Sequence, residues 1–219
     1  MRVVYGGTFD PIHHGHLRLA IELRERLGVP AVSLVPSHIP PHRGAPGATS
    51  ADRLALLHRA VADEPGLVVD DRELSRGGAS YTADTLRQLR RELGAQEPLV
   101  MVLGSDAFAG FESWRDWQAI AGLAHVVVIP RPGGELEPQS VPARLLETSP
   151  ARTLDALWAA PAGGFIWLEL PLLDISATAI REHLQQGRSP RYLLPDAVLA
   201  EIRERGLYGV HPACPRNTN

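Results

Sequence analysis

The sequence predicts an α/β fold built on an open parallel sheet with helices on both faces. Short apolar or β-branched runs alternate with longer segments of helical period along most of the chain. The chain has 219 residues, enough for one substantial core or at most two small domains. Hydrophobic residues make up 44% and charged residues 21% of it, which is typical of an ordinary globular protein. No linker divides the chain, so we expect one domain with a helical C-terminal part.

Six short runs are expected to be strands, because they are rich in apolar and β-branched residues. They are residues 2–5, 31–35, 67–69, 99–103, 125–129 and 165–168. Six longer segments carry apolar residues at helical spacing and are expected to be helices. They are residues 14–27, 50–62, 82–93, 116–121, 178–186 and 196–205.

Residues at the ends of these segments support the assignment. Gly28 and Gly94 follow predicted helices where a left-handed cap is common. The sequence Thr-Ser-Ala-Asp at residues 49–52 resembles a capping box.

Two segments break the alternation of strands and helices. Residues 37–49 are rich in Pro, His and Gly and are long for a βα loop, so we expect them to face a ligand. Residues 131–164 contain five prolines and are expected to pack as an insertion on the rim of the sheet.

Composition excludes several function classes. All 22 basic residues are Arg, because the chain contains no Lys, and this excludes a P-loop lysine, a Schiff-base lysine or a lysine-bearing synthetase loop. Abundant Arg, Ala, Pro and Gly make codon bias the simplest cause. A net charge of −3 offers no basic field for nucleic acid. The single cysteine, Cys214, allows neither a disulfide framework nor a cysteine zinc site within the chain. With no apolar run of membrane-spanning length and no signal peptide, we expect a cytoplasmic protein.

The most informative stretch follows the first predicted strand. Gly6 and Gly7 are expected to form a turn that lets a ligand approach the backbone, with the amides of the turn and of the next helix favouring an anion. His13 and His16 are three apart, so they project from one helical face and can donate hydrogen bonds to phosphate oxygens. Three other interpretations stay open: a plain glycine turn, histidines that only cap the helix, and a metal site. The last would use Asp10, His13, His14 and His16.

A second candidate segment begins the helix predicted after the last strand. Ser176 is expected to be its N-cap, which would by itself explain a Ser-Ala-Thr sequence there. The same residues suit a triphosphate, because Ser176 and Thr178 offer hydroxyls at the positive end of a helix. Arg181 stands one turn behind Thr178 and can bind phosphate oxygens in bidentate fashion.

The run Gly-Gly-Thr-Phe-Asp-Pro-Ile-His-His-Gly-His at residues 6–16 resembles the signature of the nucleotidyltransferases with an H-x-G-H motif, a Rossmann-like superfamily that transfers AMP or CMP. Residues 174–181 resemble its second motif, I-S-x-T-x-x-R. The resemblance implies that His13, His16 and Arg181 are catalytic. The ATP site that it implies consists of Gly6, Gly7, Thr8, Phe9, His13, His16, Gly104, Asp106, Ile175, Ser176, Thr178 and Arg181.

Four further segments resemble one family, the bacterial nicotinate-mononucleotide adenylyltransferases. They are residues 36–43, 80–86, 104–106 and 114–117, and the resemblance covers nearly the whole chain. It implies that Trp114 stacks on a pyridine ring while Trp117 belongs to the core. It also implies that the N-terminus of the helix beginning at Thr82 holds a carboxylate, although helix capping alone explains that segment equally well. The mononucleotide site that it implies consists of His42, Arg43, Tyr81, Thr82, Trp114, Arg115 and Arg131.

The implied reaction joins ATP and nicotinate mononucleotide, with Mg²⁺ carried mainly on the ATP phosphates. Alternatives are an adenylyltransferase that prefers nicotinamide mononucleotide or pantetheine phosphate, a nucleotide-binding module without turnover, and a tRNA synthetase fragment. The last would require a lysine loop that the chain lacks. We expect residues 1–210 to form the nucleotidyltransferase domain and residues 211–219 a disordered tail. No nucleic-acid or membrane partner is expected, and a homo-oligomer remains open.

Overall fold

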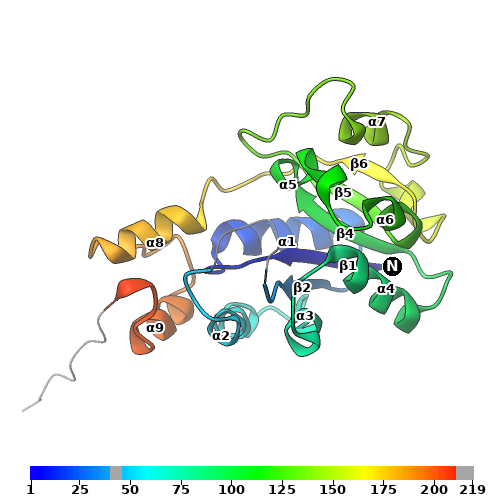
Figure 1. Cartoon of the computed structure of the whole chain (residues 1–219). Coiled ribbons are helices and arrows are strands. Elements are labelled where there is room, and N and C mark those ends of the chain that lie inside the picture. The colour runs from blue at the N-terminus through cyan, green and yellow to red at the C-terminus, as the bar shows by residue number, and fades with distance from the viewer. Residues whose placement is uncertain (40–45, 211–219) are drawn as a thin grey trace, which may run out of the picture.

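Six parallel strands form one sheet in the order β3-β2-β1-β4-β5-β6 (Figure 1). The structure is a computed structural model, and it describes residues 1–39 and 46–210. This confirms the predicted α/β fold. The strand order changes direction between β1 and β4, and open α/β sheets bind their ligands at such a point. The strands are β1 (Arg2–Gly7), β2 (Val32–Pro36), β3 (Leu67–Val69), β4 (Leu99–Gly104), β5 (His125–Ile129) and β6 (Phe165–Trp167).

The predicted helices are confirmed, two of them to the residue and the others within two residues at each end. They are α1 (His14–Leu27), α2 (Ser50–Val61), α4 (Thr82–Leu93), α6 (Trp117–Leu123), α8 (Ala177–Gln185) and α9 (Asp196–Glu204). Shorter elements were not predicted. They are α3 (Arg72–Arg76), α5 (Ser105–Ala109), α7 (Val141–Glu147) and the 3₁₀ turns η1 (Phe111–Ser113), η2 (Asp155–Trp158) and η3 (Leu207–Gly209).

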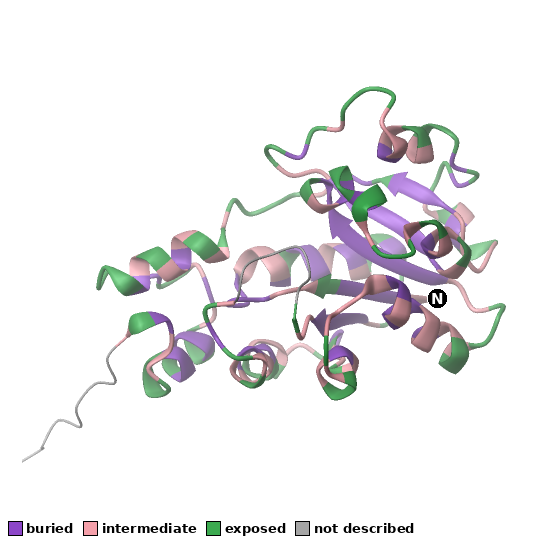
Figure 2. Cartoon of the chain, viewed as in Figure 1, coloured by how far each residue is buried: buried purple, intermediate pink, exposed green. Residues whose placement is uncertain are grey.

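Helices cover both faces of the sheet, and each face has its own core. Val3 belongs to the core shared with α1, α2, α8 and α9, whereas the next residue, Val4, belongs to the core shared with α4, α5 and α6. Successive side chains of a strand point to opposite faces, so a strand buried on both sides is apolar throughout. Figure 2 shows this arrangement as buried strands flanked by helices whose outer sides are exposed.

Local signals at helix ends are partly confirmed. The amide of Asp52 donates to Thr49 Oγ1 at 3.1 Å and the Thr49 hydroxyl donates back to Asp52 Oδ2 at 2.6 Å, so the capping motif forms. Gly28 adopts the left-handed conformation, with φ 62° and ψ 33°. The same prediction for Gly94 is wrong, because its ψ of 177° at φ 80° directs the chain into an extended path toward β4.

The expected turn at Gly6 and Gly7 is also wrong. Both glycines are the last residues of β1, where they pair with Val35 and Pro36 of β2. The turn lies one step later, at residues 8–13. The backbone of the two glycines therefore forms part of the carboxyl edge of the sheet.

The segment from 131 to 164 packs at the β6 edge, as predicted. Helix α7 contacts β6, and Figure 1 shows it beyond that strand. Leu145 and Leu146 pack against one core, while Ala151 and Leu157 are buried in the other. The other irregular segment lies partly outside the described residues, since residues 40–45 are not described, and neither is the tail at 211–219.

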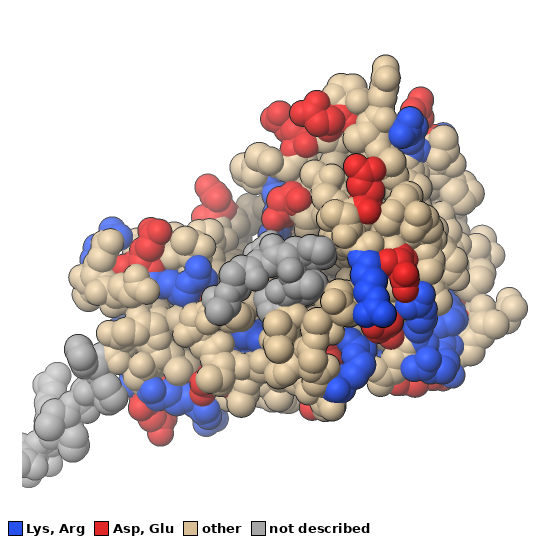
Figure 3. All heavy atoms as spheres, in the orientation of Figure 1, with Lys and Arg blue, Asp and Glu red and all other residues tan. Residues whose placement is uncertain are grey.

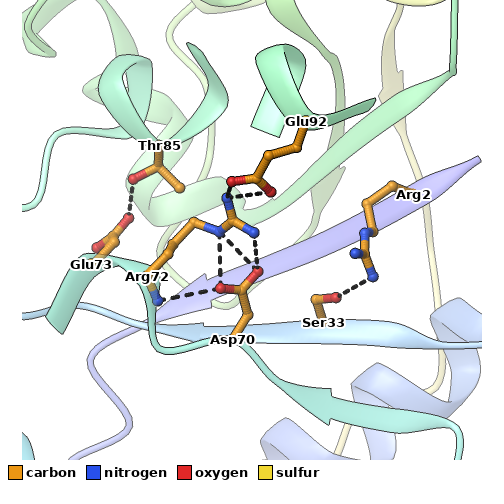
Figure 4. A network of polar contacts seen from close by, with 7 residues as sticks. All are labelled: Arg2, Ser33, Asp70, Arg72, Glu73, Thr85 and Glu92. Atoms are coloured by element: carbon orange, nitrogen blue, oxygen red, sulfur yellow. Dashed lines mark hydrogen bonds and ion pairs between the residues drawn. The ribbon is translucent and has the colours of Figure 1, made fainter. Parts of the chain in front are cut away.

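A polar network joins α3 to α4 beside β3 (Figure 4). Arg72 pairs with Asp70 at 2.8 Å and with Glu92 of α4 at 3.0 Å. The buried Thr85 hydroxyl donates to Glu73 Oε1 at 2.6 Å. These contacts hold α4 at both ends, with Thr85 in its first turn and Glu92 in its last turn.

On the face drawn in Figure 3, Arg side chains lie interspersed with Asp and Glu rather than gathered in a single basic patch. That pattern agrees with the low net charge of −3. Within residues 1–39 and 46–210, no helix has the length and apolar character needed to cross a membrane.

Candidate active site

The site begins where β1 ends. Phe9 adopts a positive φ of 49° and is buried, so its ring folds back against the strand. A Cβ on Gly7 would lie 2.9 Å from that ring, which only glycine avoids. A Cβ on Gly6 would meet nothing within 4 Å, so the backbone there is open to a ligand.

The two predicted histidines meet on the next turn. His13 is the N-cap of α1, and its ring stacks on that of His16 with centroids 3.6 Å apart. The edge of His16 meets Phe9 at 5.1 Å. Burial lowers the pKa of His13 to about 4, with smaller contributions from the charges of Arg131 and His14. His13 is therefore a neutral imidazole at pH 7, and it can donate a hydrogen bond to a phosphate oxygen without carrying charge.

A second part of the site lies where β4 and β5 end. The Arg131 amide donates to Ser105 Oγ at 2.9 Å, and its guanidinium donates to the Tyr5 hydroxyl at 3.3 Å. Its Nη1 lies 3.9 Å from Asp106 Oδ1. A Cβ on Gly104 would lie 2.4 Å from that oxygen and 2.8 Å from the Arg131 side chain. Glycine at position 104 thus permits this pair.

Tyr5 joins the two parts. Its ring meets Phe9 edge to face at 5.7 Å and lies 6.3 Å from His16. Its hydroxyl accepts from Arg131. Sequence reasoning missed this residue, because a tyrosine inside an apolar strand reads as core.

The second motif reaches the same turn from the other end of the chain. Ser176 caps α8, accepting from the Ala179 amide at 3.1 Å, as predicted, and Ile175 packs beside it against the core. Arg181 donates to Thr178 Oγ1 at 3.2 Å and to the Asp10 carbonyl at 2.7 Å. The predicted pairing of Thr178 and Arg181 on one face is confirmed, and it lies against the turn at 8–13.

Arg53 is a further residue that sequence reasoning missed. It is fully buried, and its guanidinium donates to the Thr8 carbonyl at 2.6 Å and to the carbonyls of Ser37 and His38 at 2.7 and 3.0 Å. Burial lowers its pKa. These three hydrogen bonds, made by two nitrogens, tie the loop after β1 to the loop after β2. The available signal was its position, since it stands three and four residues before the buried Leu56 and Leu57 on α2.

The residues expected around the pyridine ring of the mononucleotide also lie close together. The Arg115 guanidinium carbon lies 4.6 Å from the centre of the Tyr81 ring. Thr82 is the first residue of α4, and Tyr81 makes no side-chain capping bond there, so side-chain capping by Tyr81 does not explain this segment. Trp114 is half-buried against Phe111 at 5.5 Å. Trp117 also packs on Phe111, at 6.0 Å, as the core position predicted for it requires.

His42 and Arg43, predicted to contact the mononucleotide, lie outside the described residues. Within the described part of the chain, no group of three His, Cys, Asp or Glu side chains is arranged to hold a metal ion. Asp10, considered above as a metal ligand, instead accepts from the amides of Gly47 and Ala48 at 2.7 and 3.2 Å.

The fold and this site define a class. A family model described as cytidylyltransferase-like matches residues 4–183, so the chain is a nucleotidyltransferase. A protein of Marinobacter nauticus named as a probable nicotinate-nucleotide adenylyltransferase is 59% identical over 97% of this chain and 98% of its own length. A protein of the same name from Chromohalobacter salexigens is 48% identical over 93% of each chain. The chain belongs to the nicotinate-nucleotide adenylyltransferase family.

Solved structures share the fold. Nicotinic acid mononucleotide adenylyltransferase of Plasmodium falciparum, solved in complex with NaAD, aligns with a TM-score of 0.72 at 16% identity. The alignment covers 95% of this chain and 97% of that one. A crystal structure from Vibrio parahaemolyticus, described as that of a putative nicotinate-nucleotide adenylyltransferase, aligns over 95% and 96% of the two chains, with a TM-score of 0.61 at 17% identity. These likenesses confirm the Rossmann-like architecture.

Proposed function

We propose that this chain transfers AMP from ATP to nicotinate mononucleotide, giving nicotinate adenine dinucleotide and pyrophosphate for NAD biosynthesis. One observation carries the proposal. The stacked His13 and His16, together with Arg131, lie at the carboxyl edge of β1 and β5, in a chain 59% identical to a relative named for this activity. The edge between β1 and β4 is where doubly wound sheets bind nucleotides.

ATP is assigned to the β1 edge and to the start of α8. The backbone at Gly6 is open, and the Arg181 guanidinium of α8 reaches the turn after β1 while it also donates to Thr178 Oγ1. Helix N-termini and arginine forks suit phosphate oxygens. The residues assigned to ATP are Gly6, Gly7, Thr8, Phe9, His13, His16, Gly104, Asp106, Ile175, Ser176, Thr178 and Arg181.

Nicotinate mononucleotide is assigned to the neighbouring α4 edge. The α4 N-terminus has no side-chain cap from Tyr81, so its first-turn amides would suit a carboxylate, and the ring of Trp114 offers a stacking face. This carboxylate distinguishes nicotinate mononucleotide from nicotinamide mononucleotide, which carries an amide in its place. The residues assigned to this substrate are His42, Arg43, Tyr81, Thr82, Trp114, Arg115 and Arg131.

The chemistry demands little of the protein beyond position and charge. The attacking phosphate monoester has a second pKa of about 6, so it is largely ionised at pH 7 and needs no general base. The protein must hold two polyanions in line and stabilise charge on the α-phosphate and the departing pyrophosphate. We assign that stabilisation to His13, His16 and Arg181, and the phosphate contacts between the two substrates to Arg131.

A divalent cation enters with ATP, and we propose Mg²⁺. This ion prefers phosphate oxygens and retained waters to a protein cage. The open backbone at Gly6 leaves room there for the ATP phosphates that would carry the ion. When bound, such an ion would neutralise charge on the triphosphate, and the residues assigned above would contact the nucleotides rather than the ion.

The test uses the purified full chain with ATP and Mg²⁺, in the presence and absence of nicotinate mononucleotide. Pyrophosphate release and dinucleotide mass are followed together. We expect one pyrophosphate for each nicotinate adenine dinucleotide, and no release without the mononucleotide. Saturable ATP binding with no pyrophosphate under either condition would instead identify a nucleotide-binding module.

Two broader assignments belong to the same proposal. Residues 1–210 act as one nucleotidyltransferase unit, which the family match to residues 4–183 supports. The reaction takes place in the cytoplasm, which the use of ATP and the presence of only one cysteine support.

A further inference from the structure

The C-terminal end of the described chain returns to the turn after β1. Tyr208, in η3, is buried, and its hydroxyl donates to Asp10 Oδ1 at 2.9 Å across 198 residues of sequence. Tyr208 has a φ of 57° between Gly206 and Gly209, whose φ angles are 64° and 78°. A non-glycine residue rarely adopts this conformation, so tertiary contacts must hold it there.

Asp10 is the centre of these contacts. Besides Tyr208, its carboxylate accepts from the amides of Gly47 and Ala48 at 2.7 and 3.2 Å. Arg181 Nη1 lies 3.7 Å from Oδ2 of the same carboxylate and donates to the Asp10 carbonyl at 2.7 Å. One residue therefore joins the β1 turn, the segment before α2, the C-terminal turn and the motif arginine.

Arg181 has little freedom in this arrangement. A Cβ on Gly47 would lie 3.2 Å from Arg181 Cδ and 3.1 Å from the Tyr208 ring, so the arginine stem and the tyrosine both rest on that glycine. A hollow of about 450 Å³ borders the same residues, together with Gln185 and Leu207. Because Asp10 holds one end of the guanidinium, its remaining donors have a fixed direction.

We infer that Asp10 and Tyr208 are positioning residues that aim Arg181 at the ATP phosphates. The inference rests on the proposed function, in which Arg181 stabilises charge on the transferred phosphate. Nothing in the assigned substrate sites involves Tyr208 itself, and its hydroxyl faces Asp10. Burial and the neighbouring Asp10 carboxylate raise the pKa of Tyr208, so the hydroxyl stays a donor throughout the working range of pH.

A double-mutant cycle of Tyr208 with Arg181 distinguishes a role in positioning Arg181 from a role in the stability of the fold. Tyr208→Phe keeps the buried ring, and Asp10 Oδ1 keeps its bond from the Ala48 amide, so the variant is expected to fold. In the wild-type background we expect kcat/KM for ATP to fall about tenfold, with KM for the mononucleotide unchanged. In an Arg181→Ala background we expect the same substitution to change kcat/KM less than about twofold, because the residue being aimed is absent. Tyr192→Phe is the matched control, since Tyr192 is 82% exposed, and it should be neutral.

Gly47→Ala tests the same inference without removing a hydrogen bond. The added methyl must displace Arg181 or Tyr208 by a few tenths of an ångström, so kcat should fall while the melting temperature changes little. Gly122→Ala is its control, because a Cβ at Gly122 meets nothing within 4 Å.

The outcomes separate this inference from the proposed function. Equal losses for Tyr208→Phe in both backgrounds would indicate a structural role and overturn the inference alone. Wild-type rates from Tyr208→Phe and Gly47→Ala would overturn it as well. A wild-type chain that forms no dinucleotide would overturn the proposed function, and the inference with it.

Discussion

The imidazole rings of His13 and His16 stack with centroids 3.6 Å apart and planes inclined by 26°. Two imidazolium ions at this separation would repel each other strongly. The geometry therefore favours two neutral rings that donate hydrogen bonds over two positively charged rings. Under the proposed function, fixed positive charge comes instead from arginines, Arg131 and Arg181 among them. This division of labour suits a chain whose 22 basic residues are all Arg.

His16→Ala removes one of the two stacked donors. We expect turnover to fall by on the order of 10²-fold or more, because a preorganised donor to the developing phosphate charge is lost while the fold stays intact. Steady-state kinetics and circular dichroism check this together. His58→Ala, on the exposed side of α2, is the control. Near-wild-type turnover in a folded His16→Ala protein would remove His16 from the mechanism.

His13 links stability to pH. Burial lowers its pKa to about 4, whereas the pKa returns to its usual 6.5 in the unfolded chain. Between these values the unfolded state binds more protons, so stability is complete above pH 6.5 and declines as the pH falls toward 4. We expect wild type to lose about 3 kcal/mol more than His13→Gln between pH 7 and pH 4. Urea titrations at each pH measure the difference, and parallel curves would show that His13 is not the titrating group.

Gly104→Ala tests the pairing of Asp106 with Arg131. The backbone at Gly104 has φ −75° and ψ 155°, which alanine adopts without strain. The new methyl would nevertheless overlap Asp106 and Arg131, so both side chains must move. We expect kcat/KM to fall about tenfold with little change in melting temperature. Gly110→Ala, whose nearest neighbour would be 3.8 Å away, is the control. If both variants match wild type, the Asp106 and Arg131 pair does not bind substrate.

Thr85→Val tests the network under α4 in Figure 4. Valine keeps the shape of threonine but removes the donor to Glu73, leaving a buried carboxylate without that bond. The expected loss is about 1–3 kcal/mol in the free energy of unfolding. Denaturant unfolding measures it, with Thr148→Val at an exposed helix end as the control. A change below about 0.5 kcal/mol would mean that the network contributes little.

The sequence was most informative where the signal is local. The strand and helix pattern, the Thr49 cap and the Ser176 cap each depend on neighbouring residues, and the structure confirms them. The helices α3, α5 and α7 have only five to seven residues, too few to repeat a helical period. At the end of β1, glycine signals a turn by composition, but pairing with β2 extends the strand instead.

The missed site residues depend on contacts between distant segments. Arg53 reaches Thr8 across 45 positions, and Tyr208 reaches Asp10 across 198. The helical spacing of Arg53 from Leu56 and Leu57 could indicate that it points inward, but no spacing rule within one segment shows which distant residues it contacts. The contact of Arg115 with Tyr81 depends likewise on how α4 and α6 pack.

The most direct test of the proposed function compares the two pyridine mononucleotides in one assay. Initial rates of pyrophosphate release from ATP are measured with nicotinate mononucleotide and with nicotinamide mononucleotide over a range of concentrations. The arrangement of the α4 N-terminus beside Trp114 and Arg115 predicts a higher kcat/KM for the nicotinate form. A higher kcat/KM for the nicotinamide form, or no release with either, would contradict the proposal.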